Sequence, residues 1–217
     1  MRTALVISLC AALAGCSKKE AAPTVGSGSG SDLGSAGSGS AYAALGHKPA
    51  NARRATPPPG IEAAAVAVGA TAPDVELADA VTGTPWKLGD ALAAYDHVMI
   101  LFYRGDWCPH CRKQLGEIQS MATTFEQKKI GFVAISVDEP PAGKALAEKM
   151  NLMFPILSDP KATTLKAYGV FDPENEIAWA SIFIVGKDKK IEKRWLADTF
   201  SQRIATADVI ADLPAAH

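Results

Sequence analysis

The chain has 217 residues, enough for one domain of ordinary size with extensions. Its formal net charge is −1, so there is no basic surplus to support nucleic-acid binding, and we expect no nucleic-acid partner. Hydrophobic residues make up 48% of the chain, which suffices for a packed core once the apolar N-terminus is discounted.

Residues 1–15 have the features of a lipoprotein signal peptide. Arg2 supplies a positive start, and the apolar run from Ala4 to Ala14 is too short to span a membrane as a helix. The run ends in LAGC, which resembles the lipobox of bacterial lipoproteins. That resemblance implies that Cys16 carries lipid and anchors the mature chain to a membrane. The alternative is a plain secretory signal followed by a chance cysteine.

This processing predicts the compartment and the number of free thiols. We expect a protein of the cell envelope, on the periplasmic side, anchored to a membrane. An aspartate directly after the lipidated cysteine would resemble a signal for retention in the inner membrane. This chain has Ser17 at that position, so the outer membrane is favoured. Cys10 leaves with the signal and Cys16 carries lipid, so Cys108 and Cys111 remain as the free thiols. In an oxidising compartment they pair with each other or with another molecule.

Residues 16–60 are predicted to join the lipidated cysteine to the domain as a flexible linker. The stretch VGSGSGSDLGSAGSGSA is flexible by composition, and the three prolines of NARRATPPPG stiffen the chain that follows. No apolar periodicity is present here, so we expect disorder and a role in holding the domain away from the membrane.

The predicted domain covers residues 61–217 and alternates strands with helices. Continuous apolar runs at 97–103 and 131–137 predict strands that are buried on both faces. An apolar stripe that includes Leu115 and Phe125 predicts a helix from Pro109 onward. The other expected elements are a short alternating run and a turn before residue 97, a helix at 142–150, a short edge segment at 154–157, a helix at 160–168, a hairpin formed by 181–185 and 190–197, and a closing helix at 204–213. This order predicts a three-layer α/β domain with a mixed sheet.

Cys108 and Cys111 lie just after a predicted strand and at the start of a predicted helix. Pro109 fits the first helical turn, and the unpaired N–H groups there stabilise a thiolate. Cys111 lies one turn further on the same face, where it could attack a mixed disulfide formed at Cys108. A charged His110 between them would make the disulfide more oxidising. The alternative for His110 is an exposed residue without a tuning role.

A redox centre is favoured over two other uses of this cysteine pair. A structural disulfide across so short a loop removes little chain entropy. A zinc site needs about four ligands, whereas the other histidines, His47, His97 and His217, are scattered and the sequence has no second CxxC. We therefore expect no metal and no cofactor.

Several segments together resemble the peroxiredoxin-like (AhpC/TSA) branch of the thioredoxin superfamily. They are VGATAPDVEL, ILFYRGDWCPHCRKQLGEIQ, FVAISVDEP, FPILSDP, AYGV and SIFIVGKDKKI. The resemblance covers about residues 68–213. It implies a thioredoxin-like three-layer α/β/α domain with a mixed central sheet. It also implies that Cys108 is the attacking thiol and Cys111 the resolving thiol.

The sequence departs from the family at positions that carry chemistry. Typical peroxiredoxins have a Thr or Ser three residues before the reactive cysteine and a proline seven before it, but Gly105 and Leu101 stand here. They also place an arginine three residues before the Phe of the late strand, where this chain has Ala180. Thioredoxins place a cis-proline near that spot, and we expect no cis peptide at Ala180. Many thioredoxins bury an acid at the position of Phe102.

Other side chains near the motif have two interpretations each. Arg104 could bind a peroxide anion or a thiolate, although a solvated loop arginine is favoured. Asp106 is expected at the surface. Trp107 is expected to dock a partner with its flat ring, the alternative being core packing. Trp179 and Trp195 are expected in the core or on a sheet face.

These features predict a membrane-anchored, extracytoplasmic thiol-disulfide oxidoreductase whose partners are protein thiols or disulfides. The alternative is a thiol-dependent peroxidase in which Cys108 becomes a sulfenic acid and Cys111 closes the disulfide. Either enzyme needs an external thiol reductant or oxidant. A third possibility is a tethered binding module without catalysis.

Overall fold

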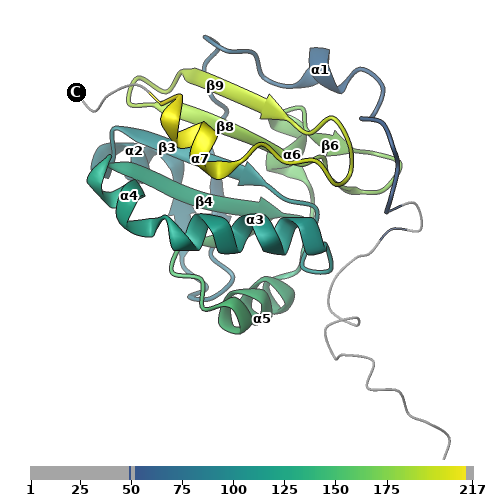
Figure 1. Ribbon diagram of the computed structural model, residues 1–217, viewed down its shortest axis with the longest axis horizontal. Coiled ribbons are helices and arrows are strands. Elements are labelled where there is room, and N and C mark those ends of the chain that lie inside the picture. Colours follow the sequence, from purple (N-terminus) through teal and green to yellow (C-terminus); the bar gives the residue numbers. More distant parts are fainter. Residues whose placement is uncertain (1–48, 50–51, 214–217) are drawn as a thin grey trace, which may run out of the picture. The chain divides into compact units, whose positions relative to one another are not determined.

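A mixed five-stranded sheet with the order β5-β4-β3-β8-β9 forms the centre of the computed structural model (Figure 1). β3 (His97–Phe102), β4 (Ile130–Ser136) and β5 (Ile156–Ser158) run parallel to one another. β8 (Ser181–Gly186) pairs antiparallel with both β3 and β9 (Ile191–Leu196). The structure describes residue 49 and residues 52–213. The predicted signal peptide, Cys16 and most of the predicted linker lie outside the described residues.

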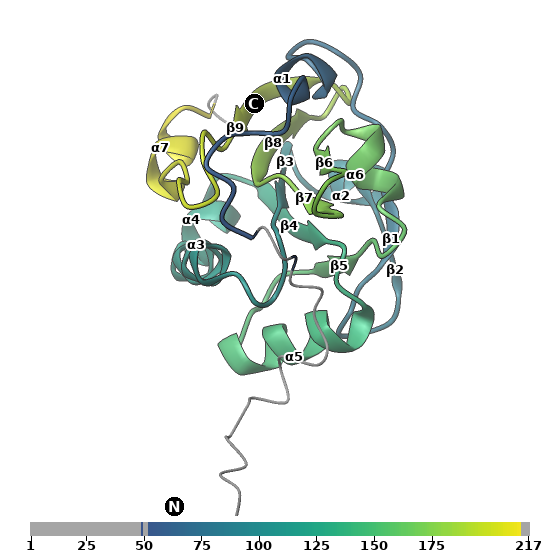
Figure 2. The same ribbon diagram turned by 90° about the vertical axis from the view of Figure 1, so that its right-hand side faces the viewer.

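Helices cover both faces of this sheet (Figure 2). They are α1 (Ile61–Ala64), α2 (Leu88–Ala94), α3 (Pro109–Ser120), α4 (Ala122–Gln127), α5 (Pro140–Met150), α6 (Thr163–Ala167) and α7 (Thr206–Ala211). Two small hairpins complete the described fold, β1 (Glu76–Ala78) with β2 (Pro85–Lys87), and β6 (Phe171–Asp172) with β7 (Ile177–Ala178). None of the helices within residues 52–213 is long and apolar enough to cross a membrane.

The alternation of side chains along β3 creates two hydrophobic cores, one on each face of the sheet. Val98, Ile100 and Phe102 belong to the core beneath α2 and α6. Met99 and Leu101 belong to the other core, which contains apolar side chains of α3, α4, α5 and α7 together with both cysteines. Every residue of β3 is buried, as expected for a central strand covered on both faces.

The predicted three-layer α/β/α domain with a mixed sheet is confirmed. The strands expected at 97–103 and 131–137 are β3 and β4, and the late hairpin is β8 with β9. One prediction differs, because the helix expected from Pro109 through Phe125 ends at Ser120 and restarts at Ala122. The N–H of Met121 bonds to the carbonyl of Ile118, three residues back, which tightens the last turn. The helix α2 was not predicted, since only Leu88 and Leu92 are buried in its seven residues.

A glycine at position 169 allows α1 to pack closely against the domain. Gly169 has φ +69°, and a Cβ there would lie 2.0 Å from the carbonyl oxygen of Ala64. The segments next to this contact are also hydrogen-bonded, because the N–H of Val66 donates to the carbonyl oxygen of Tyr168 at 3.1 Å. Gly83, in the β1–β2 turn, has a similar φ of +72° but open space around the same position.

We predict that Gly169→Ala destabilises the protein much more than Gly83→Ala. The left-handed conformation costs either alanine about 1–2 kcal/mol. The clash with the Ala64 backbone adds about 1–3 kcal/mol at position 169 alone. Urea unfolding of both variants measures the difference in free energy of unfolding. Equal losses in the two variants would show that the α1 contact does not contribute to stability.

Candidate active site

The loop after β3 places Cys108 as the N-cap of α3. The N–H of Cys111 points at the Cys108 sulfur, with N and Sγ 3.4 Å apart. Pro109 occupies the first turn of the helix, as predicted. The two cysteines therefore lie one helical turn apart, at the end of the sheet where β3 finishes.

The two sulfur atoms are in direct contact and are shielded from solvent. Cys111 Sγ lies 2.7 Å from Cys108 Sγ, and the two share a hydrogen bond. Both residues are free cysteines with 0% of their surface exposed. Burial disfavours a charged thiolate, so ionisation of this pair depends on the groups around it.

Arg203 supplies a positive charge close to both sulfur atoms. Its Nη2 lies 3.4 Å from Cys111 Sγ and 3.9 Å from Cys108 Sγ. Nη1 of the same side chain donates to the carbonyl oxygen of Phe200 at 3.2 Å. The sequence analysis missed Arg203, because it lies 92 residues after Cys111 in a loop that carries no recognisable motif.

The sulfur pair holds its two protons very unequally. Burial opposes ionisation of Cys111, but the hydrogen bond with Cys108 and the charge of Arg203 together lower its pKa to about 5. The hydrogen bond with Cys111 and burial raise the pKa of Cys108. Because the two sulfurs share a hydrogen bond, they lose their protons as one coupled pair and not as two independent thiols. The first proton leaves easily, and the second stays between the two sulfurs.

Arg104 lies beside the same pair and is buried, with 2% of its surface exposed. The favoured interpretation of a solvated loop arginine is therefore wrong. Its guanidinium carbon lies 5.0 Å from the centre of the Trp107 ring and 5.8 Å from that of Phe200. Burial lowers the pKa of Arg104, and the negative charge of Cys108 and Cys111 opposes that shift. Favourable contacts between the guanidinium and the Trp107 and Phe200 rings explain how Arg104 can be buried here.

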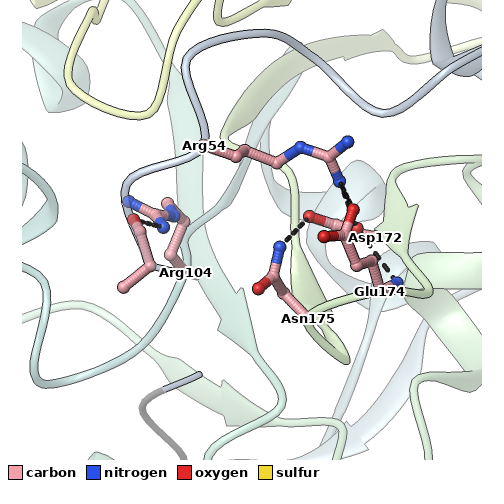
Figure 3. A network of polar contacts seen from close by, with 6 residues as sticks. Arg54, Arg104, Asp172, Glu174 and Asn175 are labelled. Atoms are coloured by element: carbon pink, nitrogen blue, oxygen red, sulfur yellow. Dashed lines mark hydrogen bonds and ion pairs between the residues drawn. The ribbon is translucent and has the colours of Figure 1, made fainter. Parts of the chain in front are cut away.

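Residues 52–60, assigned from sequence to the linker, lie against this side of the domain (Figure 3). Arg104 donates a hydrogen bond to the carbonyl oxygen of Ala52. Arg54 pairs with Asp172 Oδ1 at 2.9 Å and with Glu174 Oε2 at 3.0 Å. The second oxygen of Asp172 accepts from Asn175 Nδ2 at 2.8 Å. The chain leading into the domain is thus attached next to the active-site loop.

The structure gives physical reasons for two departures from the family pattern. Gly105 has φ +146°, and a Cβ there would lie 2.5 Å from Trp107 Nε1 and 3.1 Å from Asp138 Oδ1. A Thr or Ser hydroxyl therefore has no room at this position. Phe102 lies in the core on the sheet face opposite the cysteines, with its ring 5.1 Å from Tyr168 and 5.8 Å from Phe183. An acid at position 102 would face that apolar core. No cis peptide occurs at Ala180 or elsewhere in residues 52–213.

The aromatic residues around the motif have different surroundings. The ring of His110 packs edge-on against Phe200, with centroids 5.8 Å apart. Trp107 is half-buried beside Arg104 and keeps part of its surface exposed. Trp179 is buried and donates from Nε1 to the carbonyl oxygen of Ala197 at 2.7 Å, as expected for a core residue.

Asp106 is fully buried, so the prediction of a surface position is wrong. Its N–H donates to Asp138 Oδ2 at 2.8 Å, which draws the loop inward. The same oxygen of Asp138 accepts from Ser136 Oγ at 2.9 Å. Burial, together with the charge of Asp106, raises the pKa of Asp138 to about 6. The sequence analysis missed Asp138, although its place two residues after a buried strand was a usable signal.

A cavity of about 290 Å³ reaches Arg203 from the sheet side. Its apolar wall includes Ile182, Trp195 and Ile204. Gln114, with 2% of its surface exposed, lines the polar end. Within residues 52–213, both atoms of the Gln114 side-chain amide lack a hydrogen-bond partner. The cavity is near the lower limit of small-molecule sites in size.

The described part of the chain contains no group of three or more His, Cys, Asp or Glu side chains that could hold a metal ion. The reactive groups that the structure does bring together are the cysteine pair, two arginines and a buried carboxylate pair. Such a site suits proton-coupled sulfur chemistry.

Comparison with known proteins identifies the family. The AhpC/TSA family matches residues 68–194. A thiol-disulfide oxidoreductase ResA of Geobacillus thermodenitrificans is 30% identical over 133 residues, which cover 61% of this chain and 71% of that protein. A 1-Cys peroxiredoxin of Medicago truncatula is 28% identical over 142 residues, covering 59% and 63%. The chain thus spans less than two thirds of that second relative.

A solved structure of a peroxidoxin has a similar fold. The crystal structure of peroxidoxin BcpB from Mycobacterium tuberculosis superposes with a TM-score of 0.58 at 27% identity. The superposition covers 66% of this chain and 92% of that one. The chain therefore belongs to the AhpC/TSA family and is an oxidoreductase of the peroxiredoxin-like branch of the thioredoxin superfamily.

Proposed function

We propose that this oxidoreductase cycles Cys108 and Cys111 between a dithiol and a disulfide. The observation that carries this proposal is the contact between their sulfur atoms, 2.7 Å apart and next to Arg203. One sulfur is held as a thiolate, which is the nucleophilic form. The second sulfur is already within reach to form the bond that completes the cycle.

In disulfide exchange, the proton that the two sulfurs share passes to Cys111, and the Cys108 thiolate attacks one sulfur of a partner disulfide and releases the other as a thiolate. Cys111 then loses its proton and attacks Cys108, which expels the second partner sulfur. The partner gains two electrons, and the cysteine pair loses them. The similarity to the ResA oxidoreductase supports this first function, in which the partner is a protein disulfide or, in reverse, a protein dithiol.

A second candidate function is reduction of a hydroperoxide, and the burial of both sulfur atoms favours it. A protein disulfide must reach sulfurs that have 0% of their surface exposed, whereas a small molecule needs less room. A cavity next to them is lined by Arg203, which contacts Cys111 Sγ. The thiolate would attack the outer peroxide oxygen and form a sulfenic acid, releasing an alcohol or water. Cys111 would then displace the sulfenic oxygen as water, and an external thiol would restore the dithiol.

We also propose that the enzyme works outside the cytoplasm, anchored to a membrane through lipid on Cys16. The support is in the sequence, where a short apolar run ends in LAGC and a Gly/Ser-rich segment follows. Labelling cells with a fatty acid analogue tests this proposal, since Cys16→Ser should abolish incorporation into the protein. Incorporation that persists in Cys16→Ser would contradict it.

Two assays on the same cysteine variants test the function. We predict that Cys108→Ser lowers thiol-dependent turnover about 10³-fold or more, towards the uncatalysed rate. Cys111→Ser should complete the first attack and then stall, because the mixed disulfide or sulfenic acid has no resolving thiol. Insulin-type disulfide reduction and hydroperoxide consumption are measured in parallel with one thiol reductant.

The faster substrate identifies the main reaction. If peroxide turnover depends on Cys108 and exceeds disulfide turnover, disulfide exchange is excluded as the main role. If neither assay shows turnover that depends on Cys108, both disulfide exchange and peroxide reduction are excluded.

We predict that Arg203→Gln makes the sulfur pair harder to ionise. Removing a positive charge 3.4 Å from Cys111 Sγ raises the pKa of the first proton, because that charge favours the thiolate. The inflection in the rate of alkylation against pH should move up by about 1–2 pH units. Arg53→Gln serves as control, since Arg53 is exposed. An unmoved inflection in Arg203→Gln would exclude Arg203 as the stabilising charge.

A further inference from the structure

The topology of the sheet brings a buried carboxylate to the cysteine loop. β3 and β4 run parallel and in register, with Phe102 beside Ile135, so their carboxyl ends meet at one edge. The ladder continues past the strands, because the Tyr103 N–H bonds to the Ile135 carbonyl oxygen at 2.9 Å. The segment that carries Cys108 therefore runs alongside the segment that carries Asp138.

One oxygen of Asp138 is fixed, and the other is available. Oδ2 accepts from the Asp106 N–H at 2.8 Å and from Ser136 Oγ at 2.9 Å. Within residues 52–213, Oδ1 has no hydrogen-bond partner, although Asp138 is only 1% exposed. Oδ1 lies 3.1 Å from where a Cβ of Gly105 would be, against the loop that leads to Cys108.

The charges around Asp138 come from several elements. Asp106 and Cys111 raise the pKa of Asp138 when they are negative, after burial as the largest cause. Hydrogen bonds from Ser136 and from the Asp106 backbone act in the opposite direction. Burial is the largest cause that raises the pKa of Tyr103, and the charges of Asp138 and Cys111 add to it, so Tyr103 is part of the same surroundings. The charge of Cys111 thus acts on Asp138 across the loop that holds the cysteines.

The resolving step of the proposed cycle creates a need for a proton acceptor. In the resting pair, the hydrogen bond with Cys108 is the largest factor that lowers the pKa of Cys111. That factor disappears once the Cys108 sulfur is bonded to a substrate sulfur or oxygen, while the burial of Cys111 remains. Cys111 then holds a proton that must leave before its sulfur can attack.

We infer that Asp138 is the group that accepts the Cys111 proton during disulfide closure and returns it during reduction. The inference rests on the proposed dithiol–disulfide cycle. In closure, the Cys111 S–H bond breaks, its proton passes to the Asp138 carboxylate, and the Cys111–Cys108 bond forms. The leaving thiolate or hydroxide carries the electron pair away, and the protonated carboxyl later gives its proton to that leaving group or to solvent.

The closure step can be isolated with an aromatic disulfide reagent whose released thiolate is coloured. The reagent first forms a mixed disulfide on Cys108 of the full chain, with one equivalent of colour. Attack by Cys111 then releases the second equivalent, and its rate reports closure alone. The natural substrate is not needed, so the test remains informative if neither protein disulfides nor hydroperoxides are turned over.

In the native protein, the closure rate should rise with pH as Asp138 loses its proton, and then level off. The inflection should lie below the resting value of about 6, because Cys111 is protonated in the mixed disulfide and no longer raises the pKa of Asp138. We predict that Asp138→Asn removes this inflection and slows closure at pH 7 about 10²-fold, the lower end for general base catalysis. The first release of colour should change far less. Ser136→Ala is the matched control, because it keeps the base and removes a hydrogen bond that lowers the pKa of Asp138. Its closure inflection should remain and move to higher pH.

A second variant tests the inference if Asp138→Asn does not fold. Asp106→Asn removes a negative charge that raises the pKa of Asp138, so the closure inflection should move to lower pH. A merely structural role for Asp138 would lower stability without moving the inflection. The inference is overturned if closure in Asp138→Asn keeps the native rate and inflection, or if Asp106→Asn leaves the inflection unchanged.

Discussion

Two thiols in contact, removed from solvent and close to the guanidinium of Arg203, set the constraints for the rest of this site. Burial alone would keep both sulfurs protonated, because a buried thiolate is costly. Contact with the second thiol and with Arg203 reverses that balance for one proton and strengthens the hold on the other. The result is a nucleophile that exists at neutral pH together with a proton that must be moved at a later step. The site must therefore stabilise one thiolate and accept one proton, and Arg203 and Asp138 are the groups placed to do so.

The fold meets both requirements with segments that are distant in sequence. The parallel pairing of β3 with β4 delivers Asp138 to the cysteine loop, and the segment between β9 and α7 delivers Arg203. Arg104 is held by Trp107, by Phe200 and by the Ala52 carbonyl at the start of the described chain. Because these contacts come from separate elements, a change in any one of them would alter the site without touching a sulfur atom.

Much of the fold was predictable because β3, β4 and β8 are buried on both faces and are therefore almost wholly apolar. The cysteine pair was predictable for a similar reason, since its spacing and its place between strand and helix are local features. Arg203 and Asp138 act through space. The neighbours of Arg203 in sequence carry no sign of its role, whereas Asp138 follows a buried strand closely enough to have been a candidate. Asp106 and Arg104 were placed in solvent because charged residues in loops usually lie there. Their burial depends on partners in other segments, Asp138 for the first, and Phe200 and Ala52 for the second.

Titration of the thiolate absorbance in the fully reduced chain tests the central claim most directly. The account predicts that one thiolate per chain appears at acidic pH, near the value of about 5 for Cys111, and that the second does not appear until strongly alkaline pH. In Cys108→Ser the remaining thiol should ionise at higher pH than the first proton of the pair, because the hydrogen bond between the sulfurs is lost. Two independent ionisations near the ordinary thiol value of about 8.5 would contradict the account.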